Sequence, residues 1–478
     1  MWKIPAAAVA FATVLAANAA AQDAKPVIDD AARAMGASDL ASIAYSGPAA
    51  AGNWGQSRNI NYGLASTSIQ NYSRAIDFTQ PASLALGDTV APAGRGEPRP
   101  APRLGGYLQH VTSATPEWTQ QMEIWLTPWG FLRGAAANAA TVKSRKIDNV
   151  SYQVVTWSPA QKAPSGLPYQ VAGYIGPDHL IHRVETWVEH PVMGDLHVEA
   201  LYSGYRDAGG LKVPGRIALR QQGMESFVVV ITEARANPSN IADLMTPPPA
   251  PARGPAPGAA PLASERLADG VYRISGGYVA LAVELKDYVV VLEGGHSEAR
   301  GLAILAETKR LFPAKRIKYV VNTHPHFDHA AGLPPFAAQG ITILTDDNNK
   351  FFVEASLSQP RTLVGDTLAK ARKKPKVEGV IDKLVLTDGA RTIELHHVEK
   401  LEHSEGMLIA FLPKERILFT ADFNVPAAGQ PLSPSIATLV QNLERLQLDF
   451  ERHVMVHPPN PDRPMTKADL LTLVKGAN

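Results

Sequence analysis

Four side chains of the kinds that bind metal ions lie within six residues of the chain: His324, His326, Asp328 and His329. Residues 317–321, directly before them, form a short apolar, β-branched run that predicts a buried strand. The cluster is therefore expected on the loop that leaves a strand, where α/β proteins place much of their chemistry. The first two histidines would face one cation, and the Asp–His pair a second. Imidazole and carboxylate together suit zinc, manganese or iron.

Composition limits what else the chain can be. Its 478 residues are enough for two or three domains, and 45% of them are hydrophobic, which is ordinary for a protein with a real core. The formal net charge is +1, so no overall field favours nucleic acid or an acidic membrane. The sequence holds no cysteine, which rules out disulfides, thiolate ligands and a cysteine nucleophile. Any metal site must use nitrogen and oxygen ligands.

The N-terminal residues predict export. Lys3 is followed by an apolar run over residues 4–17 and then by Ala19-Ala20-Ala21, an Ala-x-Ala cleavage site. This order is typical of a secretory signal peptide, and the run is too short to span a bilayer. We expect cleavage after Ala21 and a periplasmic or secreted protein with no integral membrane segment.

Changes in amino-acid composition and hydrophobic pattern divide the rest of the chain. Residues 46–106 are rich in Gly, Ala, Pro and Ser and predict weak strands at best, whereas residues 107–236 hold alternating runs separated by turn signals, which predict antiparallel strands, one of them at 122–126. Residues 247–258 are almost all Pro, Ala and Gly, as in a semi-rigid linker. The predicted divisions are a signal peptide (1–21), an antiparallel β-rich domain (22–243), a linker (244–265) and a C-terminal domain (266–478).

The β-rich domain is given no catalytic residues. Its five histidines, at positions 110, 179, 182, 190 and 197, show no ligand spacing tied to a strand end. Its five tryptophans between residues 118 and 187 are expected in the sheet core. The pattern from Tyr202 to Ile217 is weakly similar to the half-barrel sheets of periplasmic lipoprotein carriers.

The sequence His-Pro-His-Phe-Asp-His at residues 324–329 resembles the HxHxDH signature of the metallo-β-lactamase fold superfamily. The resemblance extends from about residue 267 to the C-terminus and includes an opening strand at 270–274. It implies an α+β chain whose C-terminal domain is an αββα sandwich. It also implies a two-metal centre with seven protein ligands, most typically holding two Zn²⁺ ions, with Mn²⁺ or Fe²⁺ as alternatives.

The same resemblance implies where the remaining ligands lie. The third histidine of the first metal belongs in a tight turn before a strand and precedes a small hydroxyl residue, which favours His403 over His396 and His397. An aspartate at a strand end bridges the metals, and Asp422 follows an apolar run. The last ligand is His457 rather than His453. The chain departs from the pattern at Glu402, Val456 and Pro458, where the family usually has glycine.

A further departure lies upstream of the motif. The family usually ends its third strand with Asp-x-Gly, and this chain has Glu293-Gly294-Gly295. The family's acidic residue hydrogen-bonds a metal ligand from behind and so orients it. Our hypothesis is that Glu293 does the same with one more methylene.

These features predict an exported dinuclear hydrolase in which a hydroxide shared by two metal ions attacks an ester-type bond of a small molecule: a lactone, a thioester, or a carboxylic or phosphate ester. Asp328 and Asp422 are the predicted catalytic carboxylates. In the resembled family lactamases usually carry Cys or Ser at the Asp422 position, which disfavours a lactamase. Nucleic-acid substrates are disfavoured because no basic stripe is present. Two alternatives stay open, a mononuclear iron oxidoreductase of the same fold and a non-catalytic periplasmic binding protein, and so does the oligomeric state.

Overall fold

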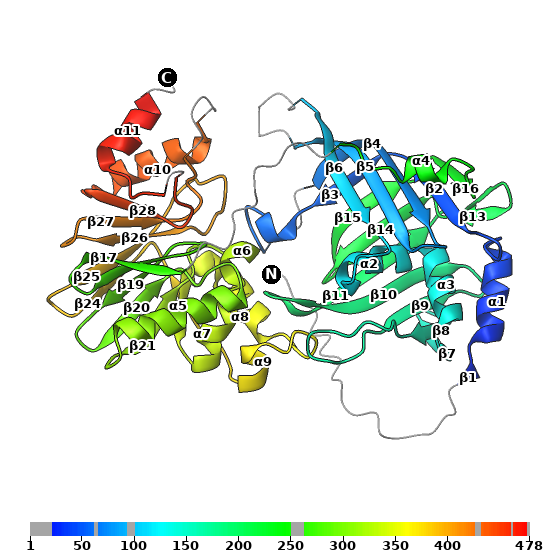
Figure 1. The fold of residues 1–478 in the computed structure, drawn as a ribbon, viewed down its shortest axis with the longest axis horizontal. Coiled ribbons are helices and arrows are strands. Elements are labelled where there is room, and N and C mark those ends of the chain that lie inside the picture. The colour runs from blue at the N-terminus through cyan, green and yellow to red at the C-terminus, as the bar shows by residue number, and fades with distance from the viewer. Residues whose placement is uncertain are drawn as a thin grey trace. The chain divides into compact units, whose positions relative to one another are not determined.

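The computed structural model describes residues 22–61, 66–92, 101–249, 262–425, 432–459 and 462–475. The predicted signal peptide and residues 250–261 of the predicted linker lie outside these ranges. The chain divides into two compact units (Figure 1). Of the described residues, unit 1 holds 22–54, 66–189 and 195–249, and unit 2 holds 55–61, 190–194 and those from 262 onward. In the described part of the chain, each helix is too short or too polar to cross a membrane.

Unit 1 is built on one 14-stranded sheet, with neighbouring strands in the order β1-β7-β8-β9-β10-β11-β14-β15-β3-β4-β2-β16 and with β5 and β6 added beside β4. Hairpins such as β4–β5 and β14–β15 pair antiparallel. Its strands are β1 (Gln22–Asp23), β2 (Ser42–Ser46), β3 (Ala49–Gly52), β4 (Ser66–Asp77), β5 (Ala82–Val90), β6 (Arg103–Val111), β7 (Thr141–Ile147), β8 (Val150–Trp157), β9 (Val171–Ile175), β10 (Ile181–His190), β11 (Gly194–Ser203), β14 (Arg216–Gln221), β15 (Met224–Val230) and β16 (Glu233–Ala236), and a separate hairpin is β12 (Arg206–Ala208) with β13 (Leu211–Val213).

The helices of this unit are α1 (Lys25–Ala34), α2 (Trp118–Trp125), α3 (Pro128–Ala137) and α4 (Ile241–Leu244). Close packing sets where α3 lies. A side chain at Gly134 would meet the Trp157 ring, and one at Gly173 would meet the Phe131 ring, both at 2.3 Å. These two glycines therefore let the helix and the strands approach closely.

Two predictions for this region were wrong. Residues 46–106 include the long strands β4, β5 and β6 instead of weak ones. These strands contain many Ser, Thr, Gln and Ala residues, which obscure the alternation of apolar and polar positions that identifies a strand. Only a few large apolar residues, such as Ile69 and Ile76, mark the buried positions. Residues 122–126 are not a strand, because 122–125 belong to α2, whose buried residues Trp118, Gln121 and Ile124 follow helical spacing. Trp118 and Trp129 are buried as expected but stand on helices.

Unit 2 contains two sheets. The larger has seven strands in sequence order, from β17 to β23, and the smaller has five, from β24 to β28. From β20 to β23 the neighbouring strands are parallel, as are β27 and β28, so helical crossovers must connect them. The strands are β17 (Ala263–Ala268), β18 (Val271–Ser275), β19 (Ala280–Glu284), β20 (Tyr288–Leu292), β21 (Arg316–Val321), β22 (Thr342–Asp346), β23 (Lys376–Val380), β24 (Lys383–Thr387), β25 (Thr392–His397), β26 (Leu408–Leu412), β27 (Ile417–Thr420) and β28 (Arg452–Met455).

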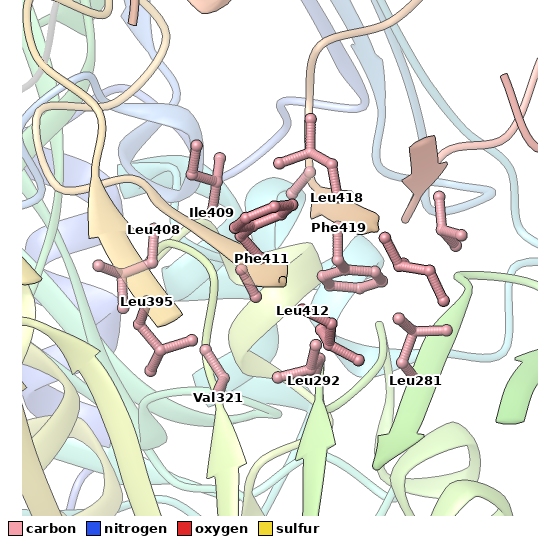
Figure 2. Close-up of a cluster of buried hydrophobic side chains, with 14 of the residues drawn as sticks. Leu281, Leu292, Val321, Leu395, Leu408, Ile409, Phe411, Leu412, Leu418 and Phe419 are labelled. Carbon is pink, nitrogen blue, oxygen red and sulfur yellow. The ribbon is translucent and has the colours of Figure 1, made fainter. Parts of the chain in front are cut away.

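The core of unit 2 lies between these sheets. Figure 2 shows Leu281, Leu292 and Val321 of the larger sheet facing Leu395, Phe411 and Phe419 of the smaller one. Two of these strands, β20 and β26, are apolar almost throughout, as expected for strands whose outer faces are covered as well. The helices are α5 (Glu298–Leu311), α6 (Phe327–Ala330), α7 (Pro334–Gln339), α8 (Asp347–Ser358), α9 (Thr367–Ala371), α10 (Pro434–Arg445) and α11 (Lys467–Lys475).

This arrangement confirms the predicted fold class, an αββα domain preceded by an antiparallel sheet domain. Side chains cap the start of two helices: the Ser433 hydroxyl accepts from the backbone of α10, and Thr466 and Asp469 bond each other's backbone N–H at the start of α11. Leu302 of α5 is 41% exposed and so lies outside the buried face of this helix.

Candidate metal centre

The motif lies where the sequence placed it, on the loop that leaves β21. His324 and His326 stand on the loop, and Asp328 and His329 lie in the short helix α6 that follows. Asn322, the first residue after β21, ties this loop together because its Nδ2 donates to the carbonyls of His324 and His329 at 2.8 and 3.3 Å. Its own Oδ1 accepts from the Thr345 hydroxyl. The loop is therefore held on the sheet edge by a buried polar side chain.

One group of predicted ligands gathers four side chains, whose donor atoms all lie within 4.8 Å of one another: His324, His326, His403 and Asp422. His324 Nε2 lies 3.0 Å from His326 Nδ1 and 3.4 Å from His403 Nε2. Asp422 Oδ2 lies 3.0 Å from His403 Nε2. Three imidazoles and one carboxylate oxygen thus face a common point.

A second group gathers Asp328, His329 and His457, again within 4.8 Å. His329 Nε2 lies 3.3 Å from His457 Nε2 and 3.6 Å from Asp328 Oδ2. The other oxygen of Asp422 reaches this group, since its Oδ1 lies 2.8 Å from His329 Nε2 and 3.0 Å from His457 Nε2. The structure therefore brings all seven predicted ligands together, with Asp422 between the two groups.

A sharp turn aims Asp422. It follows β27, and its φ of 36° lies in the left-handed region, where aspartate is tolerated better than most residues. Its Oδ1 is buried without a well-aligned hydrogen bond, although two imidazole nitrogens are close. A buried carboxylate oxygen without such a bond is costly in a dry site and fits coordination of a cation.

Hydrogen bonds on the far side of three imidazoles fix which nitrogen faces the centre. His326 Nε2 lies 3.1 Å from the Ser57 carbonyl, so this nitrogen carries the proton and Nδ1 is left to bind. His329 Nδ1 lies 3.2 Å from Glu293 Oε2. The Thr323 hydroxyl donates to the same oxygen at 2.8 Å and lies 3.2 Å from His324 Nδ1. The contact that the Glu293 hypothesis requires is present.

The charges of the site match a cation-binding centre. Burial lowers the pKa of His324 well below its usual value, and burial together with repulsion by His403 lowers the pKa of His326 to about 4. Burial opposes the charged form of His329, but Glu293 and Asp422 raise its pKa to about 10. Burial also opposes the charged form of Asp422, but the close imidazoles of His329, His403 and His457 hold its pKa far below the usual range. His324 and His326 are thus neutral imidazoles beside an ionised carboxylate, which are the states that bind metal, whereas His329 holds a proton that a cation would replace.

Two side chains that the sequence did not reveal hold Asp328. The Tyr278 hydroxyl donates to Oδ2 at 2.6 Å, and Gln56 Nε2 donates to Oδ1 at 2.6 Å. The Tyr278 ring packs edge-on against His457 at 4.3 Å between centroids. Burial, and then the hydrogen bond to Asp328, raises the pKa of Tyr278, so its hydroxyl stays a donor at working pH.

The histidines that were passed over as ligands, His396, His397 and His453, lie apart from these groups. His396 Nε2 contacts Glu394, His397 Nδ1 contacts Asp346, and His453 Nε2 contacts the Thr420 hydroxyl. In unit 1, His197 lies between Glu185 and Glu199. The positive charge in this group is supplied by the Arg183 side chain, which forms ion pairs with both carboxylates. It is a structural charge cluster.

Comparison with protein families now places unit 2. Residues 276–452 match the family model of the metallo-beta-lactamase superfamily. This part of the chain belongs to that superfamily. A search of curated proteins found no match.

Solved metallo-beta-lactamases are similar to this chain at low identity. One from Pontibacter korlensis is 16% identical, with a TM-score of 0.35, over 45% of this chain and 99% of its own. The FIM-1 enzyme from Pseudomonas aeruginosa, in its mono-zinc form, is 15% identical, with a TM-score of 0.35, over 46% and 96%. The DIM-1 enzyme is 16% identical, with a TM-score of 0.34, over 45% and 98%.

Replacing Glu293 by Ala tests the support behind the centre. The change removes the carboxylate that holds His329 and Thr323, and we expect affinity for metal to fall about 10- to 100-fold. Competition titration with a chromophoric chelator measures this. Glu298→Ala, on the start of α5, is the matched control and should bind as wild type does. A Glu293→Ala protein with unchanged affinity would contradict the role given to Glu293.

Proposed function

We propose that unit 2 is a metal-dependent hydrolase that holds two divalent cations, Zn²⁺ in the first place, and cleaves an ester-type bond of a small molecule. The observation that carries this proposal is the position of Asp422, whose two oxygens face two different groups of ligands. One carboxylate shared in this way is suited to two cations rather than one. The donors are all nitrogen and oxygen, which fits Zn²⁺ and leaves Mn²⁺ or Fe²⁺ possible.

Two such cations, when bound, would lower the pKa of a shared water toward 7 and so supply a nucleophile at neutral pH. The chain's own residues would position the substrate. The Asp328 side chain is 34% exposed and that of Asp422 only 8%, so Asp328 is the more accessible of the two predicted catalytic carboxylates. The Tyr278 hydroxyl donates its one proton to Asp328 and would therefore hold that carboxylate in place beside the substrate.

The bond type follows from Asp422. The superfamily's lactamases usually carry Cys or Ser at this position, so the aspartate favours a lactone, a thioester, or a carboxylic or phosphate ester. Because its first residues are predicted to be a secretory signal peptide, we propose that the protein acts in the periplasm or outside the cell.

His326→Ala tests the proposal. The variant should lose metal and lower hydrolysis by about 10³-fold or more, because the cations are worth several kcal/mol to the transition state. Rates on a lactone, a thioester, a p-nitrophenyl ester, a phosphodiester and a chromogenic β-lactam measure the bond type. His110→Ala, which changes an exposed histidine of β6, is the control and should behave as wild type. Full activity in His326→Ala, or activity on the β-lactam alone, would contradict the proposal.

A binding role for unit 1 is a second candidate, favoured by a cavity of about 210 Å³ between α2 and the sheet. Three rings, Tyr72, Tyr107 and Phe227, form an aromatic wall with centroids 5.4–6.1 Å apart. Arg74, 6% exposed, donates through Nε to the Ser83 hydroxyl, but its Nη2 is buried without a hydrogen bond and Glu123 Oε2 lies 3.9 Å away. Such a site would take a small aromatic or apolar molecule that presents a hydrogen-bond acceptor such as a carboxylate.

Benzoate serves as the probe for this cavity. Ligand-observed NMR should show that it binds the wild type and binds Arg74→Met at least about tenfold more weakly, the loss expected for a hydrogen bond to a charged group. Benzyl alcohol, which lacks the carboxylate, should bind both proteins alike. Equal benzoate binding by the two proteins, or none by the wild type, would contradict the binding role.

A further inference from the structure

Two short stretches from the N-terminal half of the chain belong to unit 2, although unit 1 flanks both in sequence. Residues 55–61 comprise the end of a 3₁₀ turn (Trp54–Gln56) and the loop after it. Residues 190–194 form the turn between β10 and β11. The sequence predicts both stretches to be part of the N-terminal β-rich domain and gives them no part in the metal site.

Both stretches lie against Phe327, the residue between His326 and Asp328 in the motif. A Cβ at Gly55 would lie 2.4 Å from the Phe327 ring, so only glycine fits at this approach. The His190 ring meets Phe327 edge-on, at 4.7 Å between centroids. Phe352 of α8 stacks on it at 6.3 Å. Both stretches therefore pack against Phe327, the one aromatic side chain other than histidine in the motif.

Residues 55–61 also contact two predicted ligands directly. The Ser57 carbonyl accepts the His326 Nε2 proton, and Gln56 Nε2 donates to Asp328 Oδ1. The first contact selects the nitrogen of His326 that faces the first group. The second holds the carboxylate of the second group by the oxygen that Tyr278 leaves free.

The same stretch is fastened around the His403 loop. Arg58 Nε donates to the Leu401 carbonyl at 3.3 Å, and Glu405 N donates to the Arg58 carbonyl at 2.9 Å. Asn59 Nδ2 donates to the Glu405 carboxylate. Asn61 Nδ2 donates to the Asn348 carbonyl at 2.7 Å. These bonds span both sides of His403, so one stretch touches three ligand-bearing positions.

A buried ion pair fixes the second stretch. Arg361, paired with Asp366, donates to the carbonyls of Pro191 and Val192 at 2.6 and 3.1 Å. Arginine can supply both bonds while keeping its carboxylate partner because its guanidinium carries five donors. The turn that carries His190 is therefore held firmly against the motif.

We propose that residues 55–61, seated on Phe327 with residues 190–194, are a built-in part of the metal centre, and that Gln56 is a positioning residue that sets the affinity of the Asp328–His329–His457 group. This inference rests on the proposed function, because it assumes that the two groups bind cations. It adds a requirement that the motif does not contain: the C-terminal domain needs residues from the N-terminal half to form its full centre.

Gln56→Met tests the role of Gln56, because methionine keeps the length of the side chain and removes the hydrogen bond. Stepwise Zn²⁺ affinities, measured in the full chain by competition with a chromophoric chelator, should show one of the two steps weakened about 10- to 100-fold, with the other step unchanged. Gln80→Met, at an exposed position of unit 1, is the control and should match wild type. Gly55→Ala, which pushes the whole stretch off Phe327, should weaken both steps.

The outcomes separate the two claims. If the wild type binds two Zn²⁺ ions and Gln56→Met binds both as tightly, the inference is overturned and the proposed function stands. If the wild type binds none, both are overturned. If Gly55→Ala does not fold, as judged by circular dichroism, Gln56→Met alone decides the matter, since it changes no backbone contact.

Discussion

The centre depends on one buried carboxylate. Asp422 is 8% exposed and stands among the imidazoles of His324, His329, His403 and His457, and leaving its charge uncompensated in such a site costs several kcal/mol. The imidazole of His329 can offset part of that charge by holding a proton, since its pKa is raised to about 10. Two cations would offset it fully and would replace that proton, which links metal binding to the stability of the whole site.

Architecture makes this cluster possible. The ligands come from the ends of β21, β27 and β28 and from the loop before β26, so the packing of two apolar sheets fixes their spacing. Glu293 at the end of β20 adds support from beneath, with backbone N–H groups of Gly294 and Gly295 bonded to its other oxygen. Its φ of 77° is unusual for a residue with a side chain, and such strain persists where the surroundings enforce it.

How much the sequence predicts depends on how local the signal is. The motif after β21, and the family resemblance that it supports, predicted seven side chains that the structure brings together, because each stands at a strand end or in a short turn. Gln56 and Ser57 escaped prediction because they lie 272 and 269 residues from their partners, and no periodicity links them. Tyr278 stands 50 residues from Asp328 in a glycine turn without a motif. The strands β4 to β6 escaped for a different reason, since small polar residues obscure their alternation.

Metal content per chain tests the central claim most directly. Elemental analysis would use mature protein purified without added metal, and then the same protein after loading with zinc. The account predicts two zinc or manganese ions per chain. One iron ion per chain would contradict it in favour of a mononuclear oxidoreductase, and no bound metal even after loading would contradict it in favour of a non-catalytic binding protein.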